Sequence, residues 1–284
     1  MKKFTLFAAL LLAVAFALAT PNRAALVDCD RVVVTGDDIT EQAENVPPAN
    51  HWVLFKRNAG DGQTRVGPAT PPEGVGSYEL TTPGSTDKAY LFNYDHVGTK
   101  LSDINRIGYS TYRSAGSAQQ VTALNVEIDY NGPDVTGGYA VLVFEPVYNT
   151  TQGPVVSGTW QTWDAYAGGN ARWWSSKPIN GLCAFSCYAS WDYIVANNPD
   201  AVIVGGFGLN QGSGNPGLTT SVDNLALGYG TGADAACFTY DFEPYRVAES
   251  KDDCKDGGFQ KVKTKDGAGF KNQGQCVSYV SAGK

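Results

Sequence analysis

Hydrophobic and polar residues alternate with a period of two along most of the chain beyond residue 30. The clearest case is residues 121–130, where one face carries Leu124, Val126, Ile128 and Tyr130 and the other carries Asn125, Glu127 and Asp129. Such alternation is typical of a β-strand with one buried and one exposed face. Residues 139–144 are apolar on both faces, which predicts a central strand.

Strand-like runs recur at intervals of roughly 8–20 residues, separated by Gly, Pro, Asn and Asp. They are residues 31–35, 51–57, 77–81, 88–93, 106–112, 121–130, 138–146, 158–165, 201–209 and 219–228. This spacing predicts an all-β fold, an antiparallel two-sheet sandwich of the jelly-roll or lectin-like type, with its strands running from about residue 32 to 228. We assign residues 26–243 to this domain.

One short helix is predicted inside the sandwich, over residues 190–197. Ser190 can cap it, and Trp191, Ile194 and Val195 share one face at helical spacing. Pro199 limits the helix, because the residue before a proline avoids the helical region of backbone space.

The beginning of the chain has the pattern of an export signal. Lys2 and Lys3 precede an apolar run from Phe4 to Ala19, with a second small residue at Ala17. The run is too short for a membrane span, so residues 1–19 are predicted to be a cleaved signal peptide. We therefore expect a secreted, extracellular protein without membrane insertion.

Charge divides the remaining chain into two parts. Residues 20–244 contain 11 Lys and Arg against 23 Asp and Glu, whereas residues 245–284 contain 8 against 5. The net charge of −12 on the first part argues against nucleic acid and anionic membrane surfaces as partners, and it disfavours anionic glycans. Residues 245–284 are predicted to be a separate C-terminal module held by a cysteine pair.

Six cysteines follow the predicted signal peptide. Six cysteines allow 15 pairings, but an oxidising compartment favours disulfides and two pairs are close in sequence. We predict Cys183–Cys187 and Cys254–Cys276, which leaves Cys29–Cys237 to join the two ends of the sandwich. Closing so long a loop stabilises a fold by about 4–5 kcal/mol in the chain-entropy model.

Five of the six tryptophans lie between residues 160 and 191. Sugars stack on aromatic rings while polar side chains hold their hydroxyl groups, so this segment is a candidate glycan site. The predicted ligand-binding residues are Trp160, Trp163, Asp164, Tyr166, Asn170, Arg172, Trp173 and Trp174. The alternative is that the rings fill the core. Because Trp173 and Trp174 are adjacent on an expected strand, at least one of them should lie outside the core.

Three carboxylates are candidates for acid–base catalysis. Glu127 and Asp129 resemble part of the Glu-Ile-Asp-x-x-Glu strand of laminarinase-type glycosidases, but Asn131 shows that the third acid is missing. Glu145 could supply a partner in only one strand register, which the sequence does not determine. The alternative is a solvated acidic strand face.

A structural calcium ion is a further weak candidate. Asp223 and Asn224 form a pair in the last predicted strand, which resembles jelly-roll carbohydrate modules that place calcium there. An ordinary alternating strand also explains the pair. His51 and His96 are the only histidines, which leaves little for a histidine-rich metal site or a catalytic triad. No other cofactor is indicated.

Two segments carry a resemblance to known families. Residues 205–217, together with Trp173–Trp174 and residues 92–96, resemble a family of secreted bacterial β-sandwich domains of unassigned function. The tail, with Cys254, Gly257, Gly258 and the run Phe270–Val277, resembles a short module found at the ends of other exported bacterial proteins. Phe259 stands where that module commonly has Trp. The resemblance implies bacterial origin and export, and it transfers no catalytic residue.

The sequence favours a secreted, non-enzymatic protein that binds a neutral polysaccharide or cell-surface glycan through exposed aromatic residues. The first alternative is a glycosidase-like hydrolase that uses Glu127, Asp129 or Glu145. The second is a structural extracellular protein without a small ligand.

Overall fold

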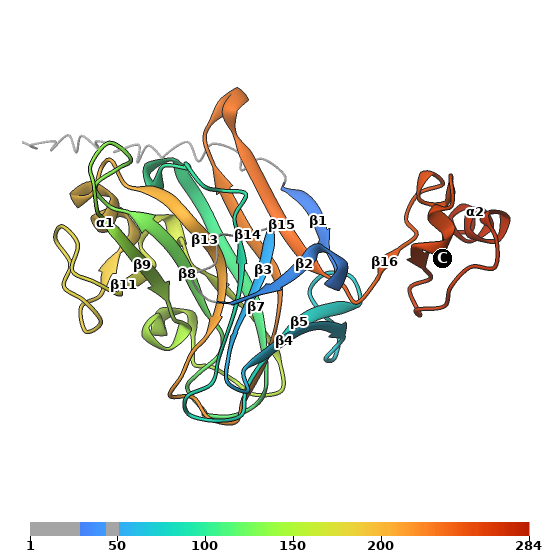
Figure 1. The fold of residues 1–284 in the computed structure, drawn as a ribbon, viewed down its shortest axis with the longest axis horizontal. Helices are drawn as coiled ribbons and strands as arrows, with labels where there is room; N and C mark the ends of the chain where they lie inside the picture. Colours follow the sequence, from blue (N-terminus) through green and yellow to red (C-terminus); the bar gives the residue numbers. More distant parts are fainter. Residues whose placement is uncertain (1–28, 44–50, 284) are drawn as a thin grey trace, which may run out of the picture.

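The computed structural model describes residues 29–43 and 51–283, so the signal peptide predicted at 1–19 lies outside the described residues. Two large β-sheets face each other across a common core (Figure 1). The sandwich-like all-β fold predicted from the sequence is confirmed. No helix in the described part of the chain combines the length and hydrophobicity needed to cross a membrane.

The seven-stranded sheet, which we call sheet A, includes both ends of the sandwich domain. Its order is β1 (Asp30–Val34), β15 (Ala236–Phe242), β14 (Leu218–Tyr229), β5 (Gly76–Thr82) and β4 (Asp61–Val66), while β7 (Ile104–Ala115) pairs with both β14 and β10 (Trp160–Asp164).

The eight-stranded sheet, which we call sheet B, packs against it. Its order is β12 (Ala189–Ser190), β11 (Arg172–Ser175), β9 (Tyr139–Phe144), β8 (Ala123–Asp129), β13 (Val202–Gln211), β6 (Lys88–Asn93), β3 (Trp52–Arg57) and β2 (Ile39–Gln42).

Two edge pairings differ from the antiparallel pattern. β1 pairs with β15 and β2 pairs with β3 in parallel. A single 3-10 turn, Gly36–Asp38, joins β1 to β2, so the chain passes from the edge of one sheet to the edge of the other without reversing. The directions of β1 and β2 are therefore set by this crossing, and in both cases the direction is parallel to the neighbouring strand.

The alternation read from the sequence sorts residues between core and surface. Leu124, Val126 and Ile128 of β8 are fully buried in the core between the sheets. The polar residues between them therefore face outward on sheet B. β4 escaped prediction because it is an edge strand of mostly polar residues. The predicted strand series also stopped at residue 228, before β15.

The helix predicted at 190–197 forms as α1 (Trp191–Asn197). The Ser190 hydroxyl oxygen accepts a hydrogen bond from the Tyr193 backbone N–H at 3.2 Å, as a cap should. Trp191 and Ile194 lie on its buried face.

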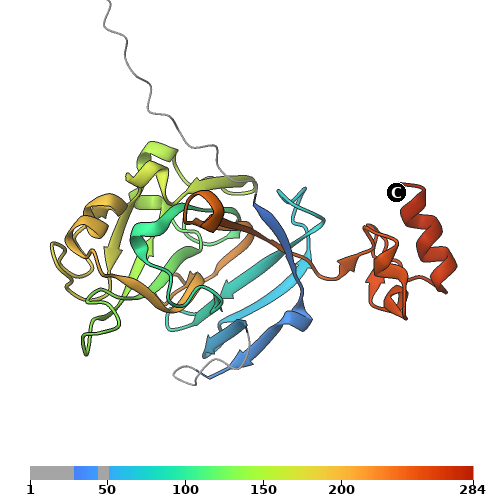
Figure 2. The same ribbon diagram turned by 90° about the horizontal axis from the view of Figure 1, so that it is seen from above.

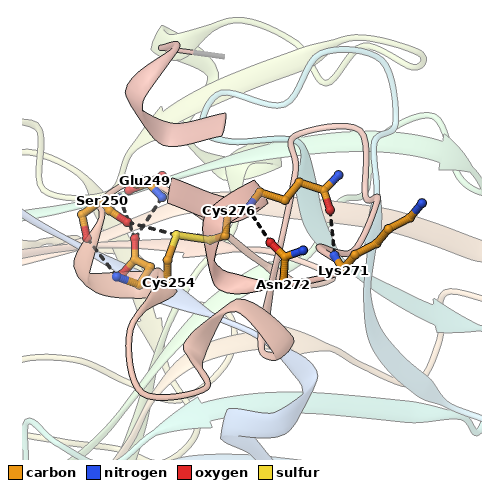
Figure 3. Close-up of a disulfide and its surroundings, with 8 residues drawn as sticks. Glu249, Ser250, Cys254, Lys271, Asn272 and Cys276 are labelled. Carbon is orange, nitrogen blue, oxygen red and sulfur yellow. Dashed lines mark hydrogen bonds between the residues drawn. A yellow bond between two sulfur atoms is a disulfide. The ribbon is translucent and has the colours of Figure 1, made fainter. Parts of the chain in front are cut away.

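The three disulfides join the predicted pairs. Cys29–Cys237 ties the segment before β1 to β15 over a separation of 208 residues, and Cys183–Cys187 closes a short loop. Cys254–Cys276 lies inside the C-terminal module (Figure 3).

The C-terminal module lies beside the sandwich and has its own small core (Figures 1 and 2). That core comprises Ala248, Cys254, Val262, Phe270 and Cys276. The module holds the parallel pair β16 (Arg246–Val247) and β17 (Val262–Lys263), and it ends in α2 (Gln273–Ser281).

Candidate functional site

The outer face of sheet A contains a groove of about 630 Å³. This volume falls in the range of roughly 300–1,000 Å³ that is common for small-molecule sites. The lining combines amide, hydroxyl, charged and aromatic groups with small residues. Its members are Asn105, Arg106, Ile107, Gly108, Tyr109, Thr162, Trp163, Asp164, Tyr166, Gly168, Asn224, Ala226, Tyr229, Gly230, Thr231, Gly232, Ala235, Ala236 and Cys237.

Small residues on neighbouring strands form the floor of this groove. Gly108 of β7 lies opposite Asp164 of β10 on one side and Ala226 of β14 on the other. Ile107 and Tyr109 are each 1% exposed and point into the core, so position 108 faces outward. A β-carbon on Gly108 would come within 3.2 Å of the Trp163 carbonyl oxygen. The groove therefore lies where Gly108 and Ala226 leave this face without a bulky side chain.

One wall is the turn that follows β10. The Asp164 carboxylate oxygen Oδ1 accepts hydrogen bonds from the backbone N–H groups of Tyr166 at 3.0 Å and Ala167 at 2.6 Å. These bonds fix the turn and place the half-buried Tyr166 ring beside the groove. Burial raises the pKa of the Tyr166 phenol, so its hydroxyl stays protonated and can donate a hydrogen bond at neutral pH.

The other wall is the turn between β14 and β15. The Asn105 side-chain amide donates to the Gly230 carbonyl oxygen at 2.7 Å, which ties this turn to β7. Gly230 has a φ of 76°, a value that favours glycine. Asn224 sits at an irregularity of β14 with a φ of 54°, a conformation that Asn tolerates better than most residues. Its amide side chain lines the groove between the two walls.

The structure separates the eight predicted ligand-binding residues. Asp164 and Tyr166 line the groove with their side chains available at the surface. Asn170 lies close by in sequence, where its amide donates to the carbonyl oxygens of Ala167 and Gly168 at 3.4 Å and supports the turn. Asn170 is not among the lining residues.

Trp163 and Trp173 are corrections, because the structure buries both. Trp163 is 1% exposed and its indole N–H donates to the Thr111 hydroxyl at 2.8 Å. Trp173 is fully buried and packs against Phe144 and Trp191, with ring centroids 5.5 and 5.2 Å away. Neither ring can stack on a sugar, and Trp163 contributes to the groove only as part of its floor.

The Trp160 side chain also makes its contacts within the protein. Its indole N–H donates to the Pro68 carbonyl oxygen at 3.0 Å, and its ring packs on Tyr112 with centroids 5.7 Å apart. The half-buried ring supports the loop before β5 and does not line the groove.

Arg172 and Trp174 lie on the opposite side of the sandwich, on the outer face of sheet B. The Trp174 indole donates to the Glu145 carboxylate at 2.8 Å, and its ring contacts Phe185, which is 64% exposed. The Arg172 guanidinium lies over the Tyr188 ring at 5.5 Å. We call Arg172, Trp174, Phe185 and Tyr188 the aromatic platform. As expected for adjacent strand positions, Trp173 is core and Trp174 is not.

The strand register puts Glu127 and Glu145 on this same outer face but far apart. Glu127 pairs with Val141, so Glu145 lies four residues further along β9, a distance of roughly 13 Å. The Glu127 carboxylate accepts from the Tyr139 hydroxyl and the Gly206 N–H, both at 2.6 Å. An inverting glycosidase needs roughly 6.5–9.5 Å between its two carboxyl groups.

Asp129 follows Glu127 on the same strand and the same face. Its Oδ1 accepts from the Asn131 N–H at 2.9 Å. None of Glu127, Asp129 and Glu145 lines the groove, in which Asp164 is the only acidic and Arg106 the only basic residue among those described.

Asp223 belongs to a buried acidic cluster with Asp241 and Glu243, beside the groove on sheet A. The Asp223 carboxylate accepts from the N–H groups of Glu73 at 2.9 Å and Phe242 at 3.3 Å. Its oxygens thus hold the loop before β5 onto the sheet. Within residues 29–43 and 51–283, no three His, Cys, Asp or Glu side chains are arranged to hold a metal ion.

Glu243, a second member of this acidic cluster, also holds the loop before β5. The Glu243 carboxylate accepts from the N–H groups of Val75 at 2.6 Å and Gly76 at 3.2 Å, while the Arg31 guanidinium pairs with Asp241. Burial raises the pKa values of Asp223 and Glu243 to about 7 and also raises the pKa of Asp241. Asp241 Oδ1 and Glu243 Oε2 accept no hydrogen bond from an N–H group, and the two carboxyl groups can bond to each other only when one of them is protonated.

Sequence reasoning missed the residues of the far wall and floor, namely Asn105, Arg106, Asn224 and Tyr229. The only available signal was the Asp223–Asn224 pair, which marked the irregularity in β14 but suggested an ion. No sequence pattern around Arg106 distinguishes it, because its place in the groove depends on the pairing of β7 with strands that are distant in sequence.

Comparison of the chain with protein-family models, with curated proteins and with solved structures found no match.

Proposed function

We propose that this protein is an extracellular glycan-binding protein and that the groove on sheet A is its binding site. The observation that carries the proposal is the composition of the groove. The half-buried Tyr166 ring, two amides, a carboxylate and a guanidinium line a groove that has small residues on its floor. A sugar needs this combination, because its C–H faces pack on rings while its hydroxyl groups need hydrogen-bond partners.

The rigidity of the walls supports the same function. Asp164 holds its own turn through two backbone hydrogen bonds, and Asn105 holds the opposite turn. A site whose walls are already ordered loses less conformational entropy on binding. The three disulfides suit an oxidising extracellular environment, where glycans are abundant ligands.

Binding is favoured over hydrolysis by the single carboxylate in the groove. Glycoside hydrolysis ordinarily uses two carboxyl groups on either side of the scissile bond. Asp164 is the only acid among the described lining residues, and its Oδ1 is already engaged by two N–H groups.

The test is a glycan array probed with the secreted protein, followed by calorimetry on the best oligosaccharide. Tyr166→Ala should weaken binding by roughly tenfold, because it removes a stacking ring. Asn224→Gly should weaken it as well, since glycine suits the backbone there but lacks the amide. Tyr193→Ala is the matched control, because Tyr193 is 49% exposed on α1 and does not line the groove.

The proposal fails if no glycan is retained. It also fails if Trp174→Ala abolishes binding while Tyr166→Ala and Asn224→Gly leave it unchanged. That second outcome would move the site to the aromatic platform.

A further inference from the structure

Arg106 lies in the middle of the groove floor. It is on β7, where its partner on β14 is Gly228 and the next outward residue along the strand is Gly108. A β-carbon on Gly228 would come within 3.1 Å of the Arg106 β-carbon, so the two strands are close here. The side chain is half-buried and lines the groove.

The Arg106 guanidinium differs from the other arginines of the described chain because it alone makes no hydrogen bond, ion pair or ring contact there. The others have partners: Arg31 with Asp241, Arg65 with Glu79, Arg113 with Ser117, Arg172 with Tyr188, Arg246 with Asp38, and Arg57 through a further contact. This groove-lining residue therefore carries five N–H donors that have no acceptor in the described protein.

Asp164 does not neutralise this cation, although both residues line the groove. No ion pair joins them, and Asp164 holds its own turn through Oδ1. A ligand in the groove thus meets a positive charge at the floor and a negative charge at the wall. The negative charge of Asp164 would repel any further anionic group of the ligand, and its carboxylate would accept hydrogen bonds from the ligand's hydroxyl groups.

We propose that the groove is specific for an acidic sugar, and that Arg106 binds the carboxylate of a uronic acid residue. The inference rests on the proposed glycan-binding function and narrows its ligand class. A guanidinium matches a carboxylate because its planar fork can donate two parallel hydrogen bonds to the two oxygens. Asp164, Asn224 and Tyr166 would then hold the hydroxyl groups and ring face of the same residue.

This assignment reverses the preference for neutral glycans inferred from the net charge. That preference treated the body as uniformly negative. At physiological ionic strength, exposed charges separated by more than about 8 Å are largely screened. The nearest charge therefore decides which ligand binds, and at the groove floor that charge is Arg106.

The inference is tested by calorimetry with trimers of galacturonic, glucuronic and mannuronic acid. Each trimer is compared with the neutral trimer made by reducing its carboxyl groups. At least one acidic trimer should bind roughly tenfold or more tightly than its reduced form, and added NaCl should weaken the acidic complex more than the neutral one. Arg106→Gln should remove both differences, and Arg106→Lys should keep part of them.

Arg172→Gln is the matched control, because it removes an arginine from the aromatic platform and should leave the preference intact. The thermal midpoint of Arg106→Gln should equal that of the parent protein, since the side chain has no partner to lose. Equal binding of acidic and reduced trimers, unchanged in Arg106→Gln, overturns the inference and leaves glycan binding standing. If neither form binds and the glycan array is empty, both proposals fall.

Discussion

Both sheets of this sandwich alternate inward and outward side chains, but their outer faces differ: one is filled by side chains and the other holds a groove. The outer face of sheet B is filled by side chains, among which Val53, Phe55 and Phe92 form a cluster exposed by no more than 6%. The outer face of sheet A carries Gly108 and Ala226 side by side and is hollow there. A groove on a sheet thus arises where side chains are missing and the flanking turns rise above the strands.

The comparison also shows that the two outer faces use aromatic residues differently. Aromatic side chains on sheet B find partners within the protein, as Trp174 does with Glu145 and Phe185. In the groove on sheet A the half-buried Tyr166 lies beside polar groups, whereas the Tyr229 ring packs on the buried His96 and on Phe238. The unpaired donors of Arg106, and not a cluster of rings, are the basis on which we propose a ligand site there.

The largest expected effect concerns the two disulfides of the sandwich, one on each sheet. Replacing Cys29 and Cys237 by Ala should lower the free energy of unfolding by about 5 kcal/mol, because that pair closes a loop of 208 residues. Replacing Cys183 and Cys187, which are four residues apart, should lower it by only about 2 kcal/mol. Urea denaturation of both variants measures the difference. Equal losses would contradict the chain-entropy account.

The next effect contrasts the inner and outer positions of one strand, β11. Trp173→Ala should lower the free energy of unfolding by roughly 3–5 kcal/mol and the midpoint by roughly 6–20 °C, because it leaves a cavity in the core. Trp174→Ala should lower it by about 1 kcal/mol, since that half-buried ring leaves no enclosed cavity. Thermal melts followed by circular dichroism compare them. If Trp174→Ala lowered the free energy of unfolding more than Trp173→Ala, then Trp174 and not Trp173 would be the ring that stabilises the core.

A smaller effect concerns the buried acidic cluster on sheet A. Its three carboxyl groups have raised pKa values in the folded protein, so the folded state binds more protons than the unfolded state between about pH 4 and 7. Stability should therefore fall as the pH rises through this window, with a midpoint several degrees lower at pH 7.5 than at pH 4.5.

Glu243→Gln tests the origin of this pH dependence. The amide keeps an acceptor for the Val75 and Gly76 N–H groups and supplies a donor for Asp241 Oδ1. The slope should flatten and the variant should be more stable than the parent at pH 7.5. Asp234→Asn, in the β14–β15 turn, is the control and should keep the parent slope. An unchanged slope in Glu243→Gln would assign the pH dependence to other groups.

The smallest effect concerns the aromatic platform. Phe185 has a φ of 55° at the tip of the Cys183–Cys187 loop, a strained value for a bulky residue. Phe185→Gly should change the free energy of unfolding by less than about 1 kcal/mol, because relief of strain offsets the lost contact with Trp174. Glycan affinity should not change. A clear loss of affinity would show that the platform takes part in binding.

The positions of most strands, the short helix and two of the cysteine pairs could be predicted because each depends on local pattern, and the pair Cys29–Cys237 then followed by elimination. The alternation in β8, the Ser190 cap of α1 and the spacing of Cys183 and Cys187 are all contained within a few residues. The edge strand β4 and the parallel pairings of β1 and β2 could not be predicted, since each depends on which strand lies beside it in the folded sheet.

The sequence by itself determined the class of fold, because period-two alternation separates a buried face from an exposed one wherever the strands pair. It did not determine the site. Whether Trp163 lies in the core or Arg106 lacks a partner depends on strands that are far apart in sequence, such as β7, β10 and β14. Those contacts are made only when the sheets assemble. For that reason the tertiary structure alone decided where the groove lies and which charge sits on its floor.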